Sequence, residues 1–176
     1  MLFSKTRISG VFTIDPEPVR DIRGFFARSF SQEEFRQQKL NSRIVQCSVS
    51  QNKTRGTLRG LHYQTSPHEE EKIVSCTRGS IYDVILDLRP KSTTCYQWVA
   101  VELTADNFRM LYIPKGCAHG FQTLEDNSLV YYQMTSFFHP ESARSVRYND
   151  PKFAIEWPVE KKIISEKDRT IPDYSL

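Results

Sequence analysis

The side chain best suited to acid–base chemistry in this sequence is that of His62, in the segment Arg59-Gly-Leu-His-Tyr-Gln64. Imidazole titrates near neutral pH, so a histidine that faces a cavity can take a proton from a substrate. Strand alternation predicts two faces here, one with Leu58, Gly60, His62 and Gln64 and the other with Arg59, Leu61 and Tyr63. An arginine and glycines beside a histidine favour the close approach of an anionic ligand. The alternative is that His62 is only a hydrogen-bonded core residue.

Lys72 follows three consecutive glutamates, Glu69 to Glu71, and begins a strand-like run. An ammonium group at the mouth of a barrel strand can stabilise the negative oxygen of an enolate. The glutamates are expected to form a solvated charge run, and Lys72 could simply belong to it.

His119 and Tyr132 are two further candidates. His119 lies in the segment 113–121, where Pro114 and Gly116 predict a tight turn that leads into a strand and aims the imidazole across the same cavity. Tyr131 and Tyr132 must face opposite sides of their strand, so one phenol points inward and could act as a general acid. A structural turn histidine and a packed tyrosine are the alternatives.

A metal site is a second hypothesis for the same region. His62, Glu70 or Glu71, and His119 could converge on one ion, as nitrogen and oxygen ligands do in metal-binding barrels. The His-x-His pair that such a site often uses is missing, because Gln64 stands two residues after His62.

The composition favours a single domain over residues 1–176 that binds a small anionic ligand. A net charge of +3, with 24 basic residues scattered among 21 acidic ones, gives no track for a nucleic acid. No apolar run reaches the roughly 20 residues that span a bilayer, so a soluble protein is expected. Four widely spaced cysteines and no apolar signal region predict reduced thiols and a cytoplasmic location.

The elements that must position these side chains are mostly short strands. Patterning predicts strands at 10–14, 25–30, 44–50, 58–64, 72–77, 81–88, 97–103, 110–113, 120–124 and 129–137. Ser31 followed by Glu34 predicts a capping box and a short helix at 32–38, and Ser165 with Asp168 predicts a one-turn capped element. Many short strands with few short helices are typical of an all-β, cupin-type jelly-roll β-barrel.

Taken in order, these motifs resemble the dTDP-4-dehydrorhamnose 3,5-epimerase family over nearly the whole chain. The matching landmarks are Asp21-Ile-Arg-Gly-Phe-Phe26, Gly56-Thr-Leu-Arg-Gly-Leu-His-Tyr-Gln64, Lys72-Ile-Val, Asp83 to Arg89, Ala118-His-Gly-Phe121, Tyr132, Asn149-Asp-Pro151, Ile155-Glu-Trp-Pro158 and Ser165-Glu-Lys-Asp168. The resemblance implies a cofactor-free, metal-free isomerase that inverts C3 and C5 of a nucleotide-linked 4-keto sugar through an enolate. It also implies a homodimer.

The resemblance implies a role for each candidate residue. His62 would be the general base, oriented by Asp168, with Tyr132 as the acid on the opposite face and Lys72 on the enolate oxygen. The substrate-binding residues would be Arg23, Gln46, Ser48, Arg59, His119, Phe138 and Lys167. Of these, Arg23 and Arg59 would bind the diphosphate or nucleotide, and Phe138 would stack on the base.

Three positions depart from the family pattern, and all three serve nucleotide binding there. This chain has Arg28 and Ala143 where glutamates are usual and Ser48 where asparagine is usual. These differences leave open a different nucleotide base or sugar. The sequence is also compatible with an enzyme that inverts C3 alone, with a metal-dependent cupin enzyme and with a non-catalytic sugar-nucleotide-binding module.

Overall fold

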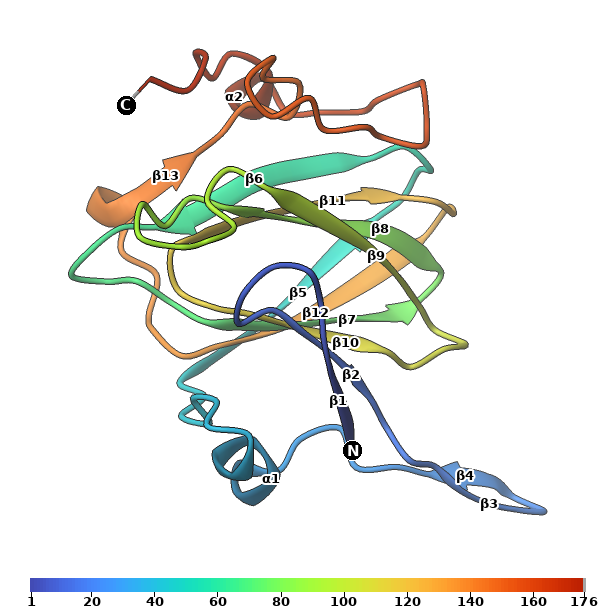
Figure 1. The fold of residues 1–176 in the computed structure, drawn as a ribbon. Helices are drawn as coiled ribbons and strands as arrows, with labels where there is room; N and C mark the ends of the chain where they lie inside the picture. Colours follow the sequence, from blue (N-terminus) through green and yellow to red (C-terminus); the bar gives the residue numbers. More distant parts are fainter. Residues whose placement is uncertain (176) are drawn as a thin grey trace.

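The computed structural model describes residues 1–175 as two antiparallel β-sheets packed face to face (Figure 1). The first sheet has the strand order β1-β2-β10-β7-β12-β5, formed by Leu2–Lys5, Phe12–Asp15, Met110–Ile113, Lys72–Arg78, Ser128–Met134 and Gln46–Asn52. The second has the order β13-β6-β11-β8-β9, formed by Ala143–Ser145, Leu58–Gln64, Cys117–Thr123, Ser80–Asp87 and Trp98–Thr104. A separate hairpin of β3 (Val19–Asp21) and β4 (Gly24–Phe26) projects away from both sheets (Figure 1).

Strand alternation builds the core between the sheets. In β8, Ile81 and Ile85 point inward, while Val84 and Leu86 point to the outer face, and all four are fully buried. The inward residues meet Val74 of β7, Val130 of β12 and others in one apolar cluster. Because both faces of β8 are covered, its sequence is an almost continuous apolar run.

Each outer sheet face has its own cover. The short helix α1 (Gln32–Gln37) places Phe35 on Ile73, Met110 and other residues of the six-stranded sheet. The C-terminal segment, red in Figure 1, crosses the five-stranded sheet and packs Phe153 and Ile155 onto it. This cover positions the last helix, α2 (Glu166–Arg169), beside β6.

The predicted strands are confirmed in place, with differences at their ends. The expected strand at 25–30 stops at Phe26, and β11 begins at Cys117, so His119 lies within a strand and not in a turn. Patterning missed β1, β3 and β13, which have only three or four residues each. Such short strands offer too few residues for alternation to show.

The two predicted helix starts are present, but one cap differs from the prediction. The Ser31 hydroxyl accepts a hydrogen bond from the Glu34 N–H, and the Ser165 hydroxyl accepts one from the Asp168 N–H. The Glu34 side chain does not complete a capping box, because it pairs with the terminal amine of Met1 and with Arg28. The 3-10 helix η1 (Pro140–Ser142) was not predicted.

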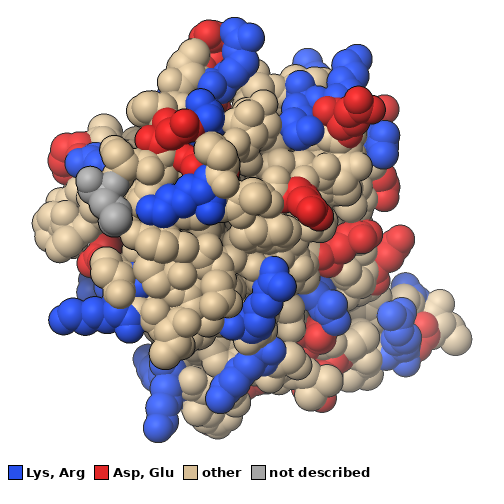
Figure 2. All heavy atoms as spheres, turned by 45° about the horizontal axis from the view of Figure 1, so that its top comes forward, with Lys and Arg blue, Asp and Glu red and all other residues tan. Residues whose placement is uncertain are grey.

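Charged side chains are mixed on the surface. On the face drawn in Figure 2, blue Lys and Arg side chains are interspersed with red Asp and Glu side chains. Within residues 1–175, no helix is long and apolar enough to cross a membrane.

Candidate active site

His62 is held by a carboxylate from the far end of the chain. Its Nε2 lies 2.8 Å from Oδ1 of Asp168, while the Gly60 N–H donates to Oδ2 at 3.4 Å. Burial raises the pKa of Asp168, but the hydrogen bond and charge of His62 and the Gly60 N–H outweigh it and hold the pKa below its usual range. Because an ionised carboxylate only accepts, Nε2 of His62 must be the donor. The other ring nitrogen, Nδ1, is then free to take a proton.

Backbone pairing brings Asp168 to this position. The Leu58 N–H donates to the Ile163 carbonyl at 2.8 Å, and the Ile163 N–H donates to the Gly56 carbonyl at 2.9 Å. These bonds fasten the tail along the start of β6. Helix α2 follows at once, so its first turn places Asp168 beneath His62.

The predicted alternation of β6 is wrong at its centre. Arg59 and His62 line the same cavity, although they were expected on opposite faces, and Leu61 packs on the outer side of the sheet. The pairing of β6 with β11 shifts register between His119 and Phe121, which adds an irregularity where strict alternation was assumed. The two strands approach closely at this point, because a Cβ at Gly60 would lie 2.5 Å from the Gly120 Cα, so only glycine fits there.

Lys72 is not part of a solvated charge run. Its ammonium lies 3.0 Å from Oε1 of Glu70, and the two side chains are only 14% and 11% exposed. Glu71 is also engaged, because the Asn41 amide and the Thr135 hydroxyl donate to its carboxylate. The expected solvated run is therefore wrong for Glu70 and Glu71. The ion pair with Glu70 holds the Lys72 ammonium group at the cavity wall.

Tyr132 is the inward tyrosine. Burial raises the pKa of its phenol far above the usual value and the Asp83 carboxylate adds to the rise, while the charge of Arg59 opposes it. The phenol therefore stays protonated at neutral pH. Its ring meets that of His119 edge to face, with centroids 6.1 Å apart.

Asp83 is a site residue that the sequence reasoning did not assign. Its Oδ1 lies 2.5 Å from Nε2 of His119, and both side chains are buried. Burial raises the pKa of Asp83, against the opposing charge and hydrogen bond of His119 and the charge of Lys72. Within residues 1–175, its Oδ2 has no hydrogen-bond partner. The sequence did contain a signal for this residue: Asp83 has the same parity as the inward-facing Ile81 and Ile85 of β8, and a buried carboxyl group needs a polar partner.

These groups converge on two adjoining cavities that share His62 and Lys72. One, of about 270 Å³, is lined by Ser50, Arg59, His62, Lys72, His119, Phe121, Tyr132 and Asp168. The other, of about 260 Å³, is lined by His62, Tyr63, Gln64, Glu70, Lys72, Phe138, Ala143, Arg144, Ser145 and Lys167. Together they offer a base, a protonated phenol and an ammonium around one space, with further cations at its edge.

Three predicted binding residues do not line either cavity. Arg23 is 86% exposed at the tip of the β3–β4 hairpin, where it pairs with Asp21. Ser48 is exposed on β5, and Gln46 lies near the second cavity, where its side chain accepts a hydrogen bond from the Phe138 N–H at 3.4 Å. Arg28, one of the departures from the family pattern, pairs with Glu34 at 2.9 Å, away from His62.

The predicted metal hypothesis finds no support in this geometry. Within the described part of the chain, ligand atoms of His62, Glu70 or Glu71, and His119 do not form a group within 4.8 Å of one another. Each of these side chains has a different partner: Asp168 for His62, Lys72 for Glu70 and Asp83 for His119.

The fold and the site define an acid–base isomerase on a cupin-type jelly-roll barrel. The family model for dTDP-4-dehydrorhamnose 3,5-epimerase matches residues 5–175. The chain is 42% identical to the dTDP-4-dehydrorhamnose 3,5-epimerase of Methanothermobacter thermautotrophicus over 170 residues, covering 95% of this chain and 91% of the relative. It therefore belongs to the dTDP-4-dehydrorhamnose 3,5-epimerase family, as the motifs predicted.

Solved structures agree with this assignment. The crystal structure of the enzyme of that name from Elizabethkingia anophelis superposes with a TM-score of 0.96 at 36% identity, covering 99% of this chain and 96% of the other. An epimerase from Legionella pneumophila in complex with dTDP-4-keto-L-rhamnose superposes with a TM-score of 0.90 at 37% identity, covering 99% of both chains. The predicted all-β, cupin-type fold and the isomerase class are confirmed.

Proposed function

We propose that this protein inverts C3 and C5 of dTDP-4-dehydro-6-deoxy-D-glucose to give dTDP-4-dehydro-L-rhamnose. The observation that carries the proposal is the lining of one cavity by a carboxylate-held imidazole, a protonated phenol and an ammonium group, those of His62, Tyr132 and Lys72. The keto-rhamnose nucleotide named in the Legionella pneumophila complex supports the choice of substrate.

The chemistry begins at the C4 ketone, which acidifies the hydrogens on C3 and C5. Nδ1 of His62 takes one of these hydrogens as a proton, and the electron pair of the broken C–H bond moves to O4 as an enolate. The Lys72 ammonium stabilises that oxygen. Tyr132 then gives its proton to the opposite face of the same carbon, which inverts the centre. Transfer of a proton from the His62 imidazolium to the phenolate, through water, restores both groups.

Asp168 acts through His62. Its negative charge keeps the proton on Nε2 and stabilises the imidazolium that forms when Nδ1 accepts a proton. No metal or organic cofactor takes part in this proposal, because the ammonium group and oriented donors carry the enolate charge.

Cations and an aromatic ring near the cavity suit a nucleoside diphosphate. Arg59 would bind the diphosphate, Phe138 would stack on the base, and Lys167 and His119 would make further polar contacts from the cavity walls. Gln46, which accepts a hydrogen bond from the Phe138 backbone, and the exposed Ser48 on β5 would contact parts of the nucleotide that extend beyond the cavities. Ala143 lines the second cavity in place of a longer acidic side chain. These groups support a nucleotide-linked sugar as the substrate class. The choice of thymine as the base goes further and rests on the names of the related enzymes.

A homodimer would bring Arg23 to a cavity. The hairpin that carries it forms no backbone pairing with either sheet and exposes Val19, Ile22 and Phe26 (Figure 1). If a partner subunit covered this apolar surface, Arg23 would lie beside the active site of that partner subunit. A monomeric mass in light scattering at working concentration would contradict this part of the proposal.

The single domain over residues 1–176 and the cytoplasmic location remain predictions.

Proton NMR in heavy water tests the reaction directly. The protein is incubated with dTDP-4-dehydro-6-deoxyglucose while the C3 and C5 proton signals are followed. Loss of both signals is expected. Loss at C3 alone would replace the proposal with a C3-epimerase, and loss of activity with a chelator would favour the metal-dependent alternative. A folded protein that exchanges neither proton would reject this substrate, and other nucleotide-linked keto sugars would then be tested.

A further inference from the structure

A buried carboxyl group stands behind the catalytic cavity, on the strand next to the one that carries His119. Oδ1 of Asp83 on β8 lies 2.5 Å from Nε2 of His119 on β11, and the two side chains are 0% and 5% exposed. In the pairing of these strands Asp83 is opposite Phe121 and His119 is opposite Ile85, so Asp83 and His119 are diagonal neighbours. The register of the two strands therefore fixes the contact.

This pair repeats the arrangement of the base. His119 is directly opposite His62 in the pairing of β11 with β6. Nε2 of His62 lies against Asp168, and Nε2 of its neighbour lies against Asp83. The proposed proton transfers involve Asp168 but not Asp83. A buried carboxyl group costs stability unless it is well paired, and Oδ2 of Asp83 has no partner within residues 1–175. A group of this kind indicates a role in the site.

The other ring nitrogen of His119 is open to the cavity. Within residues 1–175, Oδ2 of Asp83 and Nε of Arg147 are the only buried side-chain polar atoms without a hydrogen-bond partner. Nδ1 of His119 has no partner in this part of the chain either, so this atom is not sealed from solvent. Because His119 lines the first cavity, Nδ1 faces the space that the substrate would occupy.

We propose that Asp83 is a positioning residue, which keeps the proton of His119 on Nε2 and thereby presents Nδ1 as a hydrogen-bond acceptor for a sugar hydroxyl group. An ionised carboxylate only accepts, so Nε2 must donate, and a neutral imidazole of this tautomer accepts at Nδ1. Asp83 is fully buried and acts only through His119. The inference rests on the proposed function, whose substrate carries hydroxyl groups on C2 and C3.

Asp83→Asn tests the position of the proton. The amide keeps the size of the side chain but adds a donor. An NH₂ group in the place of Oδ2 would have no partner, and a buried N–H without a partner is rarer than a carbonyl oxygen without one. The NH₂ group should therefore turn toward the ring, and the proton of His119 should move from Nε2 to Nδ1.

Nitrogen NMR of ring-labelled protein, recorded without substrate, measures which nitrogen carries the proton. The chain has four histidines, whose signals are assigned by substituting them one at a time. We expect the proton on Nε2 of His119 in the unsubstituted protein and on Nδ1 in Asp83→Asn. A merely structural role of Asp83 would leave the tautomer unchanged.

Calorimetry with two ligands measures the effect on the sugar. dTDP-glucose carries hydroxyl groups but no ketone, so it binds without reacting. It should bind about 3- to 10-fold more weakly to Asp83→Asn, which corresponds to the loss of one neutral hydrogen bond. The affinity for dTDP, which lacks the sugar, should stay within about twofold.

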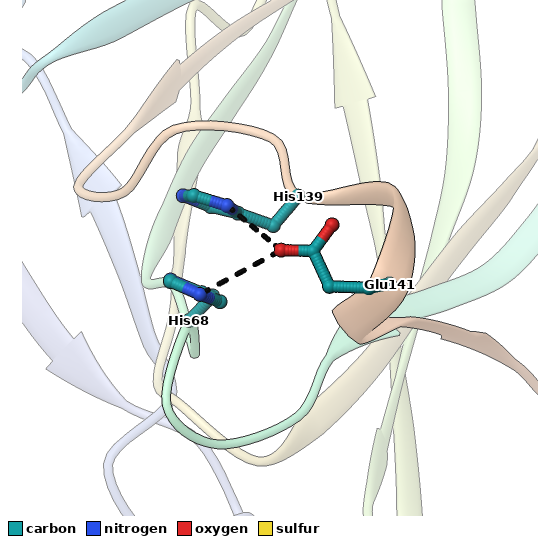
Figure 3. Close-up of side chains that lie close together, drawn as sticks. All are labelled: His68, His139 and Glu141. Atoms are coloured by element: carbon teal, nitrogen blue, oxygen red, sulfur yellow. Dashed lines mark hydrogen bonds and ion pairs between the residues drawn. The ribbon is translucent and has the colours of Figure 1, made fainter.

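Glu141→Gln is the matched control. Figure 3 shows the Glu141 carboxylate directed at the edges of the stacked rings of His68 and His139, and its Oε1 lies 3.1 Å from Nδ1 of His139. None of these three residues lines either cavity. The control removes a carboxylate from an imidazole elsewhere, so both affinities and the His119 tautomer should stay unchanged.

Three results would overturn the inference: a proton on Nδ1 of His119 in the unsubstituted protein, an unmoved proton in Asp83→Asn, or equal weakening of dTDP and dTDP-glucose binding. The first needs no variant, so the inference can be refuted even if Asp83→Asn does not fold. Absence of C3 and C5 exchange in the unsubstituted protein would reject the proposed reaction alone, because the tautomer is measured without substrate.

Discussion

Replacing Asp168 with Asn tests how much the carboxylate contributes to proton abstraction. The amide keeps the size of the side chain but removes the charge that faces Nε2 of His62 at 2.8 Å. If its NH₂ group turns toward the ring, it also forces the proton onto Nδ1, which can then no longer act as the base. The substitution thus weakens the base in two ways without opening a cavity.

The magnitude follows from the separation. A carboxylate and an imidazolium at 2.8 Å attract by about 1.5 kcal/mol in water and about 6 kcal/mol at an effective dielectric constant of 20. The His62 side chain is 44% exposed, so we take an intermediate value of about 2–4 kcal/mol. That value predicts a fall in kcat/KM of about 30- to 1,000-fold.

The assay is the initial rate of C3 and C5 proton exchange in heavy water, measured at several substrate concentrations. Glu166→Gln is the matched control, because it makes the same charge change on the same helix. The Glu166 side chain pairs with Arg169 at the surface and not with His62. The control should retain the activity of the unsubstituted protein. If Asp168→Asn keeps kcat/KM within about threefold while remaining folded, the role assigned to this carboxylate is wrong.

The other predictions concern the two proton-transfer groups and one structural carboxylate. His62→Ala should abolish exchange but leave dTDP affinity within a few-fold by calorimetry, and unchanged turnover would reject His62 as the base. Tyr132→Phe should slow inversion more than exchange, because the enolate still forms on the His62 side; NMR compares the two rates, and equal slowing would argue against Tyr132 as the acid. Burial raises the pKa of Asp87, but hydrogen bonds from Arg89 and from neighbouring hydroxyl groups outweigh it and lower the pKa to about 2. Since that pKa lies below the unfolded value of 3.8, the ionised group adds about 2 kcal/mol above about pH 5, and this is lost as the pH falls from about 4 to 2. In urea unfolding, the stability difference between the unsubstituted protein and Asp87→Asn should shrink over that range, and a constant difference would contradict the assignment.

Local patterns predicted most of the strands because alternation depends only on the backbone. The inward positions of Lys72 and Tyr132 follow the same parity as the apolar residues Val74 and Val130 beside them. The caps at Ser31 and Ser165 were predictable for a similar reason, since a cap needs only residues within one turn. The motifs around His62 and Asp168 were specific enough to indicate the family.

Contacts between distant segments were outside the reach of such patterns. The break in β6 depends on its partner strand β11, so the sequence of β6 alone predicted the wrong face for Arg59. Glu70 and Lys72 are only two residues apart, but the low exposure of both side chains depends on other segments of the fold, so local sequence predicted a solvated glutamate. Asp83 was overlooked because its partner, His119, stands 36 residues away on another strand.

The sequence by itself therefore determined the period of the strands, the helix starts and the residue types able to move a proton, since these depend on neighbours along the chain. Only the tertiary structure decided which of those groups meet. His62 reaches Asp168 across 106 residues because the tail pairs with β6, and His68 reaches His139 because Gln64 binds both backbones. The physical reason is that the packing of two sheets, and not sequence separation, sets these distances and the burial that shifts the pKa values.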